Sequence, residues 1–319
     1  MRFFAVYADT LQKIIFPRPR TSAMRITFHL PNDKAQPMDR ETELAIVRQA
    51  YAKQTLAAAR VTDPRLQAAF AAGPREDFLG PGPWLEFHMP GFYQPTVDAD
   101  PVLLYVNGLF GLVAERRINN GQPSLHAGLL AAAAIQPEDH VVHIGTGTGY
   151  YTAIMSVLAG RVTAVECDPV LAARAGVNLA RFGNTRVIEG NGAVVPLDTA
   201  DVIYVNAGVT HPVSAWLDAL AEGGRLIIPL TSDTNTRSFT SISGLFFKIQ
   251  RHGAGFEARA LLPTAIIPAE GIRDPAAEAA LAAAFTKGGW GKVTRLVRGD
   301  EGVPEDQCWV RGDGWCLAT

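Results

Sequence analysis

The sequence predicts an α/β fold with a doubly wound, mostly parallel sheet, and two observations in the central part of the chain support this prediction. From about residue 124 to residue 230, short runs rich in valine and isoleucine alternate with helical segments of about ten or more residues. Strands that are nearly continuous apolar runs are typical of parallel sheets covered by helices on both faces. A glycine-rich turn also joins the first of these strands to the next helix, as at the ligand sites of doubly wound folds.

The elements of this central part follow a regular order. Helices are expected at residues 124–134, 150–159, 169–182 and 212–221, and strands at 140–145, 161–166, 185–190, 201–206 and 224–230. The order of the strands is expected to reverse between 161–166 and 201–206, and ligands of such sheets bind in the crevice at that point. Beyond Pro229 the pattern changes to two antiparallel strands joined by a turn at 252–255.

The whole chain is expected to have four parts. These are a disordered extension, a helical and loop-rich N-terminal subdomain, the main domain and a C-terminal extension packed on it, at residues 1–37, 38–118, 119–270 and 271–319. The first part mixes apolar residues with Arg and Pro and lacks the pattern of a cleavable leader. Met24 and Met38 could serve as alternative translation starts, so we expect that part of this extension is not made.

The two flanking parts contain further elements. In the N-terminal subdomain, helices are expected at 39–60 and 63–73, followed by a loop-rich connection at 80–101. In the C-terminal extension, a short alanine-rich helix is expected at 275–286. The three tryptophans of the tail are expected to form an apolar cover for the edge of the sheet, and they are Trp290, Trp309 and Trp315.

The composition excludes several classes of protein. The net charge is −2 and there is no basic surplus, so a nucleic-acid partner is not expected. No apolar run approaches the roughly 20 residues that a membrane span needs. The three cysteines do not form a disulfide framework and include no C-x-x-C pair, so we expect no structural metal and a cytoplasmic location. Of these, Cys308 and Cys316 are expected to be buried apolar residues.

The turn from Gly145 to Gly149 is the strongest candidate for a ligand site. Glycine at positions 145, 147 and 149 lets the backbone approach a ligand closely and adopt positive φ. The helix that follows presents free N–H groups and the positive end of its dipole. Glu166 ends the next strand, 21 residues after Gly145, where an acid binds a pair of ribose hydroxyls in such folds.

The spacing of the glycines favours S-adenosylmethionine over a dinucleotide. The dinucleotide pattern is G-x-G-x-x-G, whereas this chain has G-x-G-x-G followed by Tyr150. A cofactor without phosphate needs only a close backbone and hydrogen-bonding side chains. We therefore expect a class I S-adenosylmethionine-dependent methyltransferase, with a nicotinamide or flavin enzyme and a purely structural turn as the alternatives.

At this point the chain resembles the protein-L-isoaspartate (D-aspartate) O-methyltransferases over roughly residues 40–270. The resemblance rests on segments that match in order, spacing and wording, at 66–80, 121–153, 165–166, 180–192 and 222–230. It implies a doubly wound sheet that binds S-adenosylmethionine. It also implies methyl transfer to a carboxylate of a protein, a peptide or a small molecule.

The resemblance implies a set of cofactor contacts at the ends of the strands. This set consists of His143, Gly145, Thr146, Gly147, Gly149, Glu166, Asn191, Gly192 and Asn206. The glycine turn would surround the methionine part of the cofactor, and Glu166 would bind the ribose hydroxyls. Asn191 and Gly192 would lie beside the adenine, and Asn206 and Ala207 would line the floor of the crevice.

Three departures from the family's pattern concern the same crevice. His143 stands where the family usually has an acid, two residues before the first glycine of the motif. With Pro123 aligned to the family's proline, Gln122 is kept, but 119–121 reads Asn-Asn-Gly instead of Thr-Ile-Ser. The serine that helps to hold the isoaspartyl group is therefore absent at its place. After the fourth strand, residues 206–211 read Asn-Ala-Gly-Val-Thr-His, where the family has Thr-Ala-Ala-Ala-Pro.

A carboxylate acceptor needs no general base, because Asp and Glu are already ionised at pH 7. Positioning then carries most of the catalysis. His211, Ser124 and Gln122 are the candidates for positioning the substrate, and none is a firm catalytic residue. A turn residue before Pro212 is the structural alternative for His211, and a helix N-cap is the alternative for Ser124. For residues 119–121, the structural alternative to a role in substrate binding is a plain turn. His126, on the predicted helix 124–134, is expected to be a partly buried structural residue.

Three functions are therefore open. The first is carboxyl O-methylation of an isoaspartyl or related carboxylate. The second is a methyltransferase of the same fold with another acceptor, such as a small metabolite or a modified peptide. The third is a cofactor-binding relative that does not catalyse. It would be favoured by His143 in place of an acid and by Asn191, which stands where the family usually has Asp.

Overall fold

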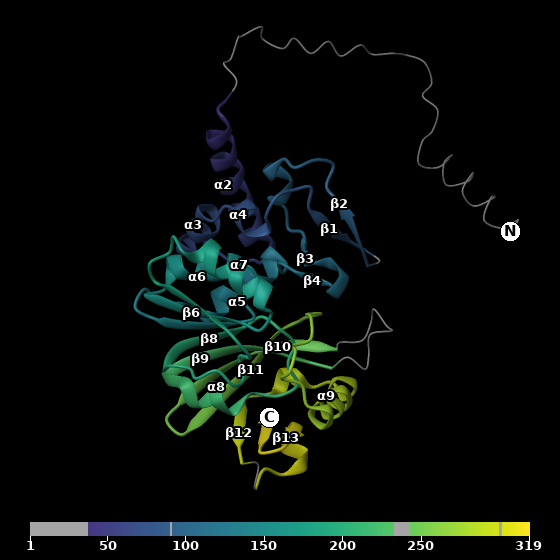
Figure 1. The fold of residues 1–319 in the computed structure, drawn as a ribbon. Coiled ribbons are helices and arrows are strands. Elements are labelled where there is room, and N and C mark those ends of the chain that lie inside the picture. Colours follow the sequence, from purple (N-terminus) through teal and green to yellow (C-terminus); the bar gives the residue numbers. More distant parts are fainter. Residues whose placement is uncertain (1–37, 90, 233–242, 300–301) are drawn as a thin grey trace, which may run out of the picture. The chain divides into compact units, whose positions relative to one another are not determined.

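The computed structural model describes residues 38–89, 91–232, 243–299 and 302–319 (Figure 1). Residues 39–319 form one compact unit. The predictions of a disordered extension at 1–37 and of an alternative start at Met24 lie outside the described residues. Within the described part, no helix is both long enough and apolar enough to cross a membrane.

A mixed sheet forms the centre of the unit, and the described residues contribute ten strands to it in the order β13-β14-β12-β11-β10-β9-β8-β5-β6-β7. The strands from β9 to β7 pair in parallel, which confirms the predicted fold class. Along the chain, this parallel part comprises β5 (His140–Ile144), β6 (Arg161–Glu166), β7 (Thr185–Glu189), β8 (Ala200–Val205) and β9 (Leu220–Thr231). The chain runs outward from β5 to β7 and then returns to the other side of β5, so the order reverses at β5 and β8.

Helices cover both faces of the parallel strands. Alternate residues of one strand point to opposite faces, and in β5 Val141 and Val142 belong to two different apolar clusters. One cluster includes residues of α5 (Pro123–Ala133), α6 (Tyr150–Leu158) and α7 (Pro169–Leu179). The other includes residues of α8 (Ser214–Ala219) and α9 (Pro275–Lys287). This two-faced burial explains why the strands are almost entirely apolar.

The predicted helix 212–221 is longer than the observed α8. The chain is already extended at Leu220, where β9 begins and pairs with Ala200 of β8. The helix therefore has six residues, and the strand has twelve instead of the seven predicted at 224–230. Tertiary pairing along β8 and β10 decides this boundary, and local helix propensity does not.

The N-terminal subdomain contains more regular structure than the sequence indicated. The expected helices are α2 (Arg40–Ala58) and α3 (Pro64–Ala72), and a short α4 (Glu76–Leu79) follows. Within the predicted loop-rich connection, the proline-rich chain forms a hairpin of β1 (Leu85–His88) and β2 (Phe92–Pro95). The remaining elements are two short 3-10 helices, Pro101–Leu104 and Ala114–Arg116, and a second pair of strands, β3 (Gly111–Val113) and β4 (Ile118–Asn119).

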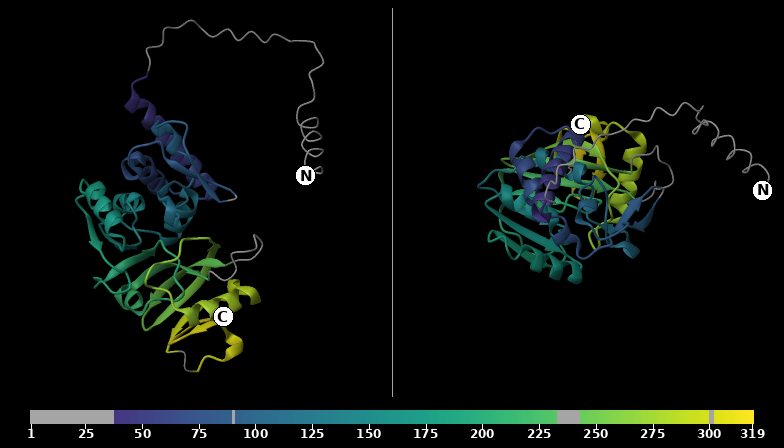
Figure 2. Two further views of the ribbon diagram at one scale, coloured as in Figure 1. Left: turned by 45° about the vertical axis from the view of Figure 1, so that its right-hand side comes forward. Right: turned by 90° about the horizontal axis from the view of Figure 1, so that it is seen from above.

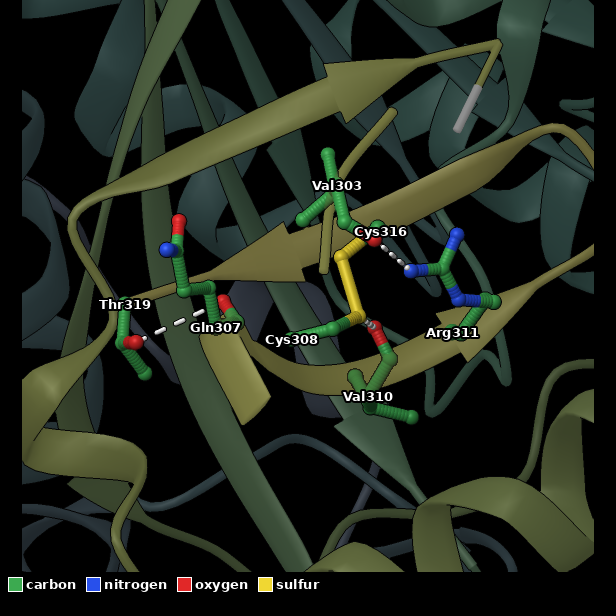
Figure 3. Close-up of a disulfide and its surroundings, with 7 residues drawn as sticks. All are labelled: Val303, Gln307, Cys308, Val310, Arg311, Cys316 and Thr319. Carbon is green, nitrogen blue, oxygen red and sulfur yellow. Dashed lines mark hydrogen bonds between the residues drawn. A yellow bond between two sulfur atoms is a disulfide. The ribbon is translucent and has the colours of Figure 1, made fainter. Parts of the chain in front are cut away.

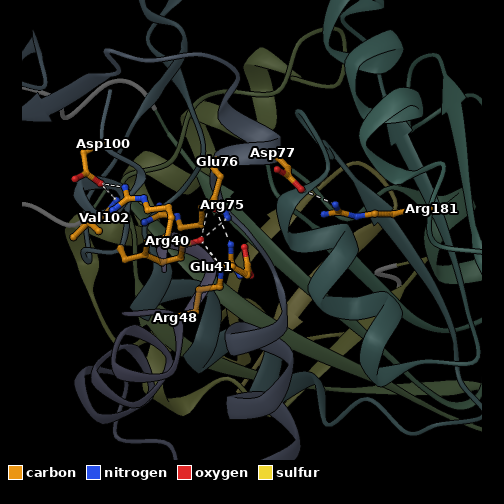
Figure 4. A network of polar contacts seen from close by, with 10 residues as sticks. Arg40, Glu41, Arg48, Arg75, Glu76, Asp77, Asp100, Val102 and Arg181 are labelled. Carbon is orange, nitrogen blue, oxygen red and sulfur yellow. Dashed lines mark hydrogen bonds and ion pairs between the residues drawn. The ribbon is translucent and has the colours of Figure 1, made fainter. Parts of the chain in front are cut away.

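Arginines connect the pieces of this subdomain (Figure 4). Arg48 lies between Glu41 and Glu76, and its distance to the Glu76 carboxylate is 2.8 Å. Arg75 is fully buried, and its guanidinium donates to backbone carbonyls that include Leu104 and lies 5.3 Å from the centre of the Tyr51 ring. Carbonyl oxygens and ring faces thus compensate the charge of this buried cation.

The C-terminal extension continues the sheet. β10 (Gly244–His252) and β11 (Gly255–Pro263) form the predicted antiparallel pair, and the tail adds β12 (Arg295–Arg298), β13 (Cys308–Gly312) and β14 (Trp315–Ala318). Trp309 and Trp315 therefore lie in strands of the sheet, and the ring of Trp309 packs against Phe247 and Phe285. This extension lies at the other end of the unit from α2 (Figure 2).

The two cysteines of this tail are buried, as expected, but the expectation that the cysteines form no disulfide is wrong. Cys308 of β13 and Cys316 of β14 are joined by a disulfide, and both are buried (Figure 3). The sequence contains no local signal for this pairing, because the approach of the two residues depends on the hairpin that the tail forms. Cys167, in contrast, is a free and exposed thiol.

Candidate cofactor and acceptor site

A cavity lies at the carboxyl ends of β5, β6 and β8, where the strand order reverses. From the sheet it is lined by the turn residues Gly145–Thr148, by Glu166–Asp168 and by Asn206 and Ala207. Its other walls include Ile118, at the end of the N-terminal subdomain, the next two residues Asn119 and Asn120, and residues 267–270. A second cavity shares Gly145 and Cys167 with the first and is lined by Asn191 and Gly192. The two cavities thus bring most of the predicted cofactor residues to one place.

The glycine turn needs its glycines for conformation and for space. Gly145 and Gly149 have φ of +77° and +99°, in the left-handed region that side chains disfavour. A Cβ on Gly145 would also lie 3.3 Å from the backbone oxygen of Asn206, on the neighbouring strand end. The N–H groups of Gly145 and Thr146 donate to the Val165 carbonyl, which holds the turn against β6. The turn is therefore a rigid wall of backbone beside the cavity.

Glu166 is buried, and hydrogen bonds from the backbone fix its position. One carboxylate oxygen accepts the N–H of Gly147 at 2.7 Å, and the other accepts the N–H of Asp168 at 3.1 Å. An ionised carboxylate offers about four lone-pair positions. The thiol of Cys167 also donates to one of these oxygens, at 3.6 Å. Three accepted bonds leave acceptor capacity for a hydroxyl donor from a ligand in the cavity.

The residues of the second cavity are equally constrained. Asn191 accepts the N–H of Ala193 and donates its amide to the Gly271 carbonyl at 3.2 Å. A Cβ on Gly192 would approach Ile144 to 2.5 Å, so only glycine fits there. Asn206 donates to the Gly145 carbonyl at 3.4 Å, across the floor between the two strand ends.

His143 is fully buried and does not line either cavity. Its Nδ1 is 2.8 Å from the hydroxyl of Thr152, and that hydroxyl contacts Thr146, which does line the cavity. Burial lowers the pKa of His143 to about 3, so the imidazole is neutral at physiological pH. Among the predicted cofactor residues, His143 would thus act on a ligand only through the two threonines.

A second buried histidine lies on α5, below the same wall. The Nδ1 of His126 is 2.7 Å from the Tyr204 hydroxyl, and its ring stacks on Tyr151 with the centroids 3.6 Å apart. Tyr151 in turn donates to the Gly121 carbonyl at 3.0 Å. Burial, and to a lesser degree the neighbouring His143, lowers the pKa of His126 to about 3. The sequence indicated a partly buried residue, whereas His126 is fully buried and supports the 119–121 segment from below.

The three candidates for positioning the substrate do not line either cavity. His211 contacts the Thr210 hydroxyl, and burial lowers its pKa while Asp274 opposes that shift. Gln122 is exposed and is itself the N-cap of α5, so the expected N-cap role of Ser124 is wrong. The N–H of Ser124 is accepted instead by the side chain of Asn107, at 2.9 Å.

Among the lining residues that were not predicted as site residues, Arg116 and Asn120 make notable polar contacts. Arg116 forms ion pairs of 2.5 Å with Asp168 on one side of the cavity and with Glu270 on another. Asn120 is buried and receives the N–H of Phe110 on its side-chain oxygen at 2.7 Å. Arg116 belongs to no motif, and Asn120 lies in the segment 119–121 that departs from the family's pattern. Their roles depend on how the N-terminal subdomain lies on the sheet, and no local pattern encodes that arrangement.

The doubly wound sheet, with a glycine turn after its central strand and an acid at the end of the next strand, defines a class I S-adenosylmethionine-dependent methyltransferase. The comparisons with known proteins give the family. The family model for protein-L-isoaspartate(D-aspartate) O-methyltransferase matches residues 104–245. The chain belongs to this family, in agreement with the resemblance found in the sequence.

Individual relatives are similar over most of their length. The protein-L-isoaspartate O-methyltransferase of Koribacter versatilis is 36% identical over 176 residues, which are 54% of this chain and 71% of the relative. The corresponding protein 1 of Rhodopseudomonas palustris is 30% identical over 209 residues, 64% of this chain and 78% of the relative. A solved structure of a protein-L-isoaspartate O-methyltransferase has a TM-score of 0.55 at 25% identity, and the match covers 72% of this chain and 66% of that one.

Proposed function

We propose that this chain methylates the carboxylate of isoaspartyl residues in proteins or peptides, with S-adenosylmethionine as the methyl donor. One observation supports this proposal above the others. A single cavity joins the glycine turn and Glu166, which suit the cofactor, to Ile118, Asn119 and Asn120, which would form the acceptor wall. The lining also suits a cationic cofactor, because its described residues include the carboxylates Glu166, Asp168 and Glu270 and only Arg116 as a cation.

In this proposal the protein acts by holding its two ligands. The cofactor would supply a methyl group on a positively charged sulfur. Glu166 would bind the ribose hydroxyls, the turn at 145–149 would hold the methionine part, and Asn191 and Gly192 would flank the adenine. Transfer of this methyl group to a carboxylate oxygen would leave the electron pair of the C–S bond on sulfur, so the products would be a neutral thioether and a neutral ester.

No proton has to be removed, because the acceptor carboxylate is ionised at pH 7. The lining of the two cavities contains no histidine within the described residues, as this chemistry requires none. An approach of about 3–3.5 Å between oxygen and methyl carbon, in line with the C–S bond, accounts for most of the acceleration. His211 would then serve the structure of the turn before Pro212.

A different acceptor is the second candidate function. Asn119 and Asn120 line the cavity, in the segment 119–121 where the resemblance leads us to expect Thr-Ile-Ser. A small carboxylic acid or a modified peptide could be recognised there with the same cofactor.

The predicted cytoplasmic location has lost one of its supports, because the Cys308–Cys316 disulfide is typical of oxidising compartments.

Transfer of a tritiated methyl group from the cofactor tests the proposal. We expect label to enter a peptide that contains isoaspartate and to be released by mild base, whereas the same peptide with ordinary aspartate stays unlabelled. Calorimetry with S-adenosylhomocysteine is the companion measurement. Binding without labelling would favour the second acceptor class. The absence of binding at millimolar concentration would contradict both enzyme functions.

A further inference from the structure

The amide group of Asn120 is a buried hydrogen-bond donor without a partner in the described structure. The residue is 8% exposed and lines the candidate cavity. Its Nδ2 has no hydrogen-bond partner. Buried polar groups almost always have a partner, so an unsatisfied donor at a cavity wall calls for a ligand group.

The orientation of this amide follows from its neighbour. The N–H of Phe110 can only be accepted by an oxygen, so the side-chain oxygen of Asn120 must face Phe110, at 2.7 Å. The backbone N–H of Asn120 donates to the Phe110 carbonyl at 3.0 Å, which fixes the same residue from a second side. The Nδ2 group is therefore held in place and is not free to turn toward another partner in the chain.

Other buried polar atoms also lack a partner, and they belong to Arg75, His126, His143, Ser232 and Thr264. None of these residues lines the candidate cavity or the cavity beside it. Among the described residues, Asn120 is thus the one that combines an unsatisfied buried donor with a place on the wall of the site.

We propose that Asn120 donates a hydrogen bond from Nδ2 to the carboxylate of the methyl acceptor and thereby selects for a carboxylate. This inference rests on the proposed function and assigns the acceptor half of the same cavity. Asn120 lines the same cavity as the glycine turn and Glu166, so an acceptor carboxylate that enters this cavity can meet its Nδ2 group. Arg116 is already paired with Asp168 and Glu270, so a neutral donor is what this wall offers to a carboxylate.

Gly121, the next residue, cannot take this role. It has no side chain, and a Cβ at its position would lie 2.2 Å from the Nε2 of His126. The acceptor wall therefore has its hydrogen-bond donor at position 120, and His126 occupies the space behind position 121. A side chain at 121 would have to displace a buried imidazole that is bonded to Tyr204.

The substitution Asn120→Asp tests the assignment with almost no change of shape. It keeps an oxygen for the Phe110 N–H and replaces the free donor by a carboxylate oxygen. We expect kcat/KM for an isoaspartyl peptide to fall roughly 10- to 100-fold, the range for a lost hydrogen bond to a charged group. The Kd for S-adenosylhomocysteine should stay within about threefold, because Asn120 is not among the predicted cofactor contacts.

The pH dependence separates this role from a structural one. A buried carboxyl has a raised pKa, so the new Asp side chain is increasingly protonated between pH 8 and pH 6 and again offers a donor. We expect the deficit of N120D relative to the native chain to shrink over this range. The matched control is Asn107→Asp, since Asn107 also accepts a backbone N–H but is exposed and outside the cavity. N107D should retain its kcat/KM within about twofold.

Each other outcome overturns the assignment. An equal loss of S-adenosylhomocysteine affinity in N120D would indicate that Nδ2 of Asn120 binds the cofactor. An unchanged kcat/KM would indicate that Nδ2 does not bind the acceptor. If N120D does not fold, Asn120→Ala, which adds no charge, should show a loss of at least about tenfold. A native chain that binds the cofactor but never labels isoaspartyl peptides would contradict the proposed function itself, and this assignment with it.

Discussion

At the scale of single residues, Glu166 has the most clearly defined task. Its carboxylate is fixed by two backbone N–H groups and keeps acceptor capacity toward the cavity. Glu166→Ala should weaken the binding of S-adenosylhomocysteine by about 1.5–3 kcal/mol, the scale of hydrogen bonds to a charged group. Titration calorimetry measures this loss directly.

The matched control is Glu189→Ala. Glu189 is the register partner of Glu166 at the end of β7, but it is exposed and does not line the cavity. This control should bind with the affinity of the native chain. An unchanged affinity in Glu166→Ala would show that the ribose does not lie where we place it.

The two buried histidines should make the fold sensitive to acid. Burial lowers the pKa of both His126 and His143 from 6.5 to about 3, so the unfolded chain takes up protons at a higher pH than the folded chain does. The free energy of unfolding should therefore be highest above pH 6.5 and fall toward pH 3. The slope is about 1.4 kcal/mol per pH unit and per histidine.

Urea unfolding followed by circular dichroism at pH 7 and pH 5 measures this dependence. His126→Gln should unfold with a weaker dependence on pH, because one of the two titrating groups is gone. His252→Gln, at the exposed turn between β10 and β11, should keep the native dependence. Equal slopes in all three chains would show that the imidazoles are not the groups that titrate.

The sequence predicted one half of the site well and the other half poorly. Strand ends carry Gly145, Glu166 and Asn206. Because the carboxyl ends of neighbouring parallel strands lie at the same edge of a sheet, the sequence alone predicts that these residues lie close together. Asn120 contacts Phe110 in a subdomain with no regular periodicity. The meeting of His126 with Tyr204 joins residues 78 positions apart and depends on how α5 packs on β8.

At the scale of elements, the hairpin of β13 and β14 carries the disulfide. The thiol of Cys167 is the free one, so thiol titration of the native chain should find one reactive group, and reduction should raise the number to three. Three groups without reduction would contradict the pairing.

Removing the disulfide should destabilise the chain. Cys308→Ser combined with Cys316→Ser opens a loop of sequence separation 8 and should cost about 2–3 kcal/mol through the entropy of the unfolded chain. Hydrogen exchange should show faster opening of β13 and β14, and Cys167→Ser, which leaves the hairpin intact, is the control.

The helices and strands differ in how well the sequence predicts them. The apolar strands of the parallel sheet and the helices between them were found within a few residues, because burial on both faces leaves a strong local pattern. The boundary between α8 and β9 was missed, since pairing with β8 and β10 extends the strand into residues that favour a helix. The hairpin of β1 and β2 was missed because prolines and glycines hide its alternation.

At the scale of the whole molecule, the sheet has two halves of different predictability. The parallel half follows from alternating elements and short connections. The antiparallel half needs β12 to lie between β11 and β14, and this order depends on contacts between segments that are far apart in sequence. The tail was therefore expected to cover the edge of the sheet, whereas it extends the sheet.

Arg116 connects the parts of the molecule around the cavity. It pairs with Asp168 after β6 and with Glu270 before α9, and all three residues line the site. Arg116→Gln should speed the release of S-adenosylhomocysteine about two- to fivefold, since exposed ion pairs contribute little individually and are screened by salt. Stopped-flow measurements of the dissociation rate at low and high salt check this expectation.

The control for Arg116 is Arg298→Gln, which removes an exposed ion pair with Asp218 outside the cavity. It should leave the dissociation rate and its dependence on salt unchanged. An identical rate in Arg116→Gln would mean that the bridge does not restrain the bound product.

The position of the Arg116 ion pairs also affects the order in which the ligands bind and are released. Arg116 closes the wall next to Asp168, near the place proposed for the ribose, whereas Asn120 faces the place proposed for the acceptor. Acceptors can then exchange while the nucleoside half stays bound. We expect steady-state kinetics in which S-adenosylmethionine binds first and S-adenosylhomocysteine leaves last, with product inhibition that is competitive toward the cofactor alone.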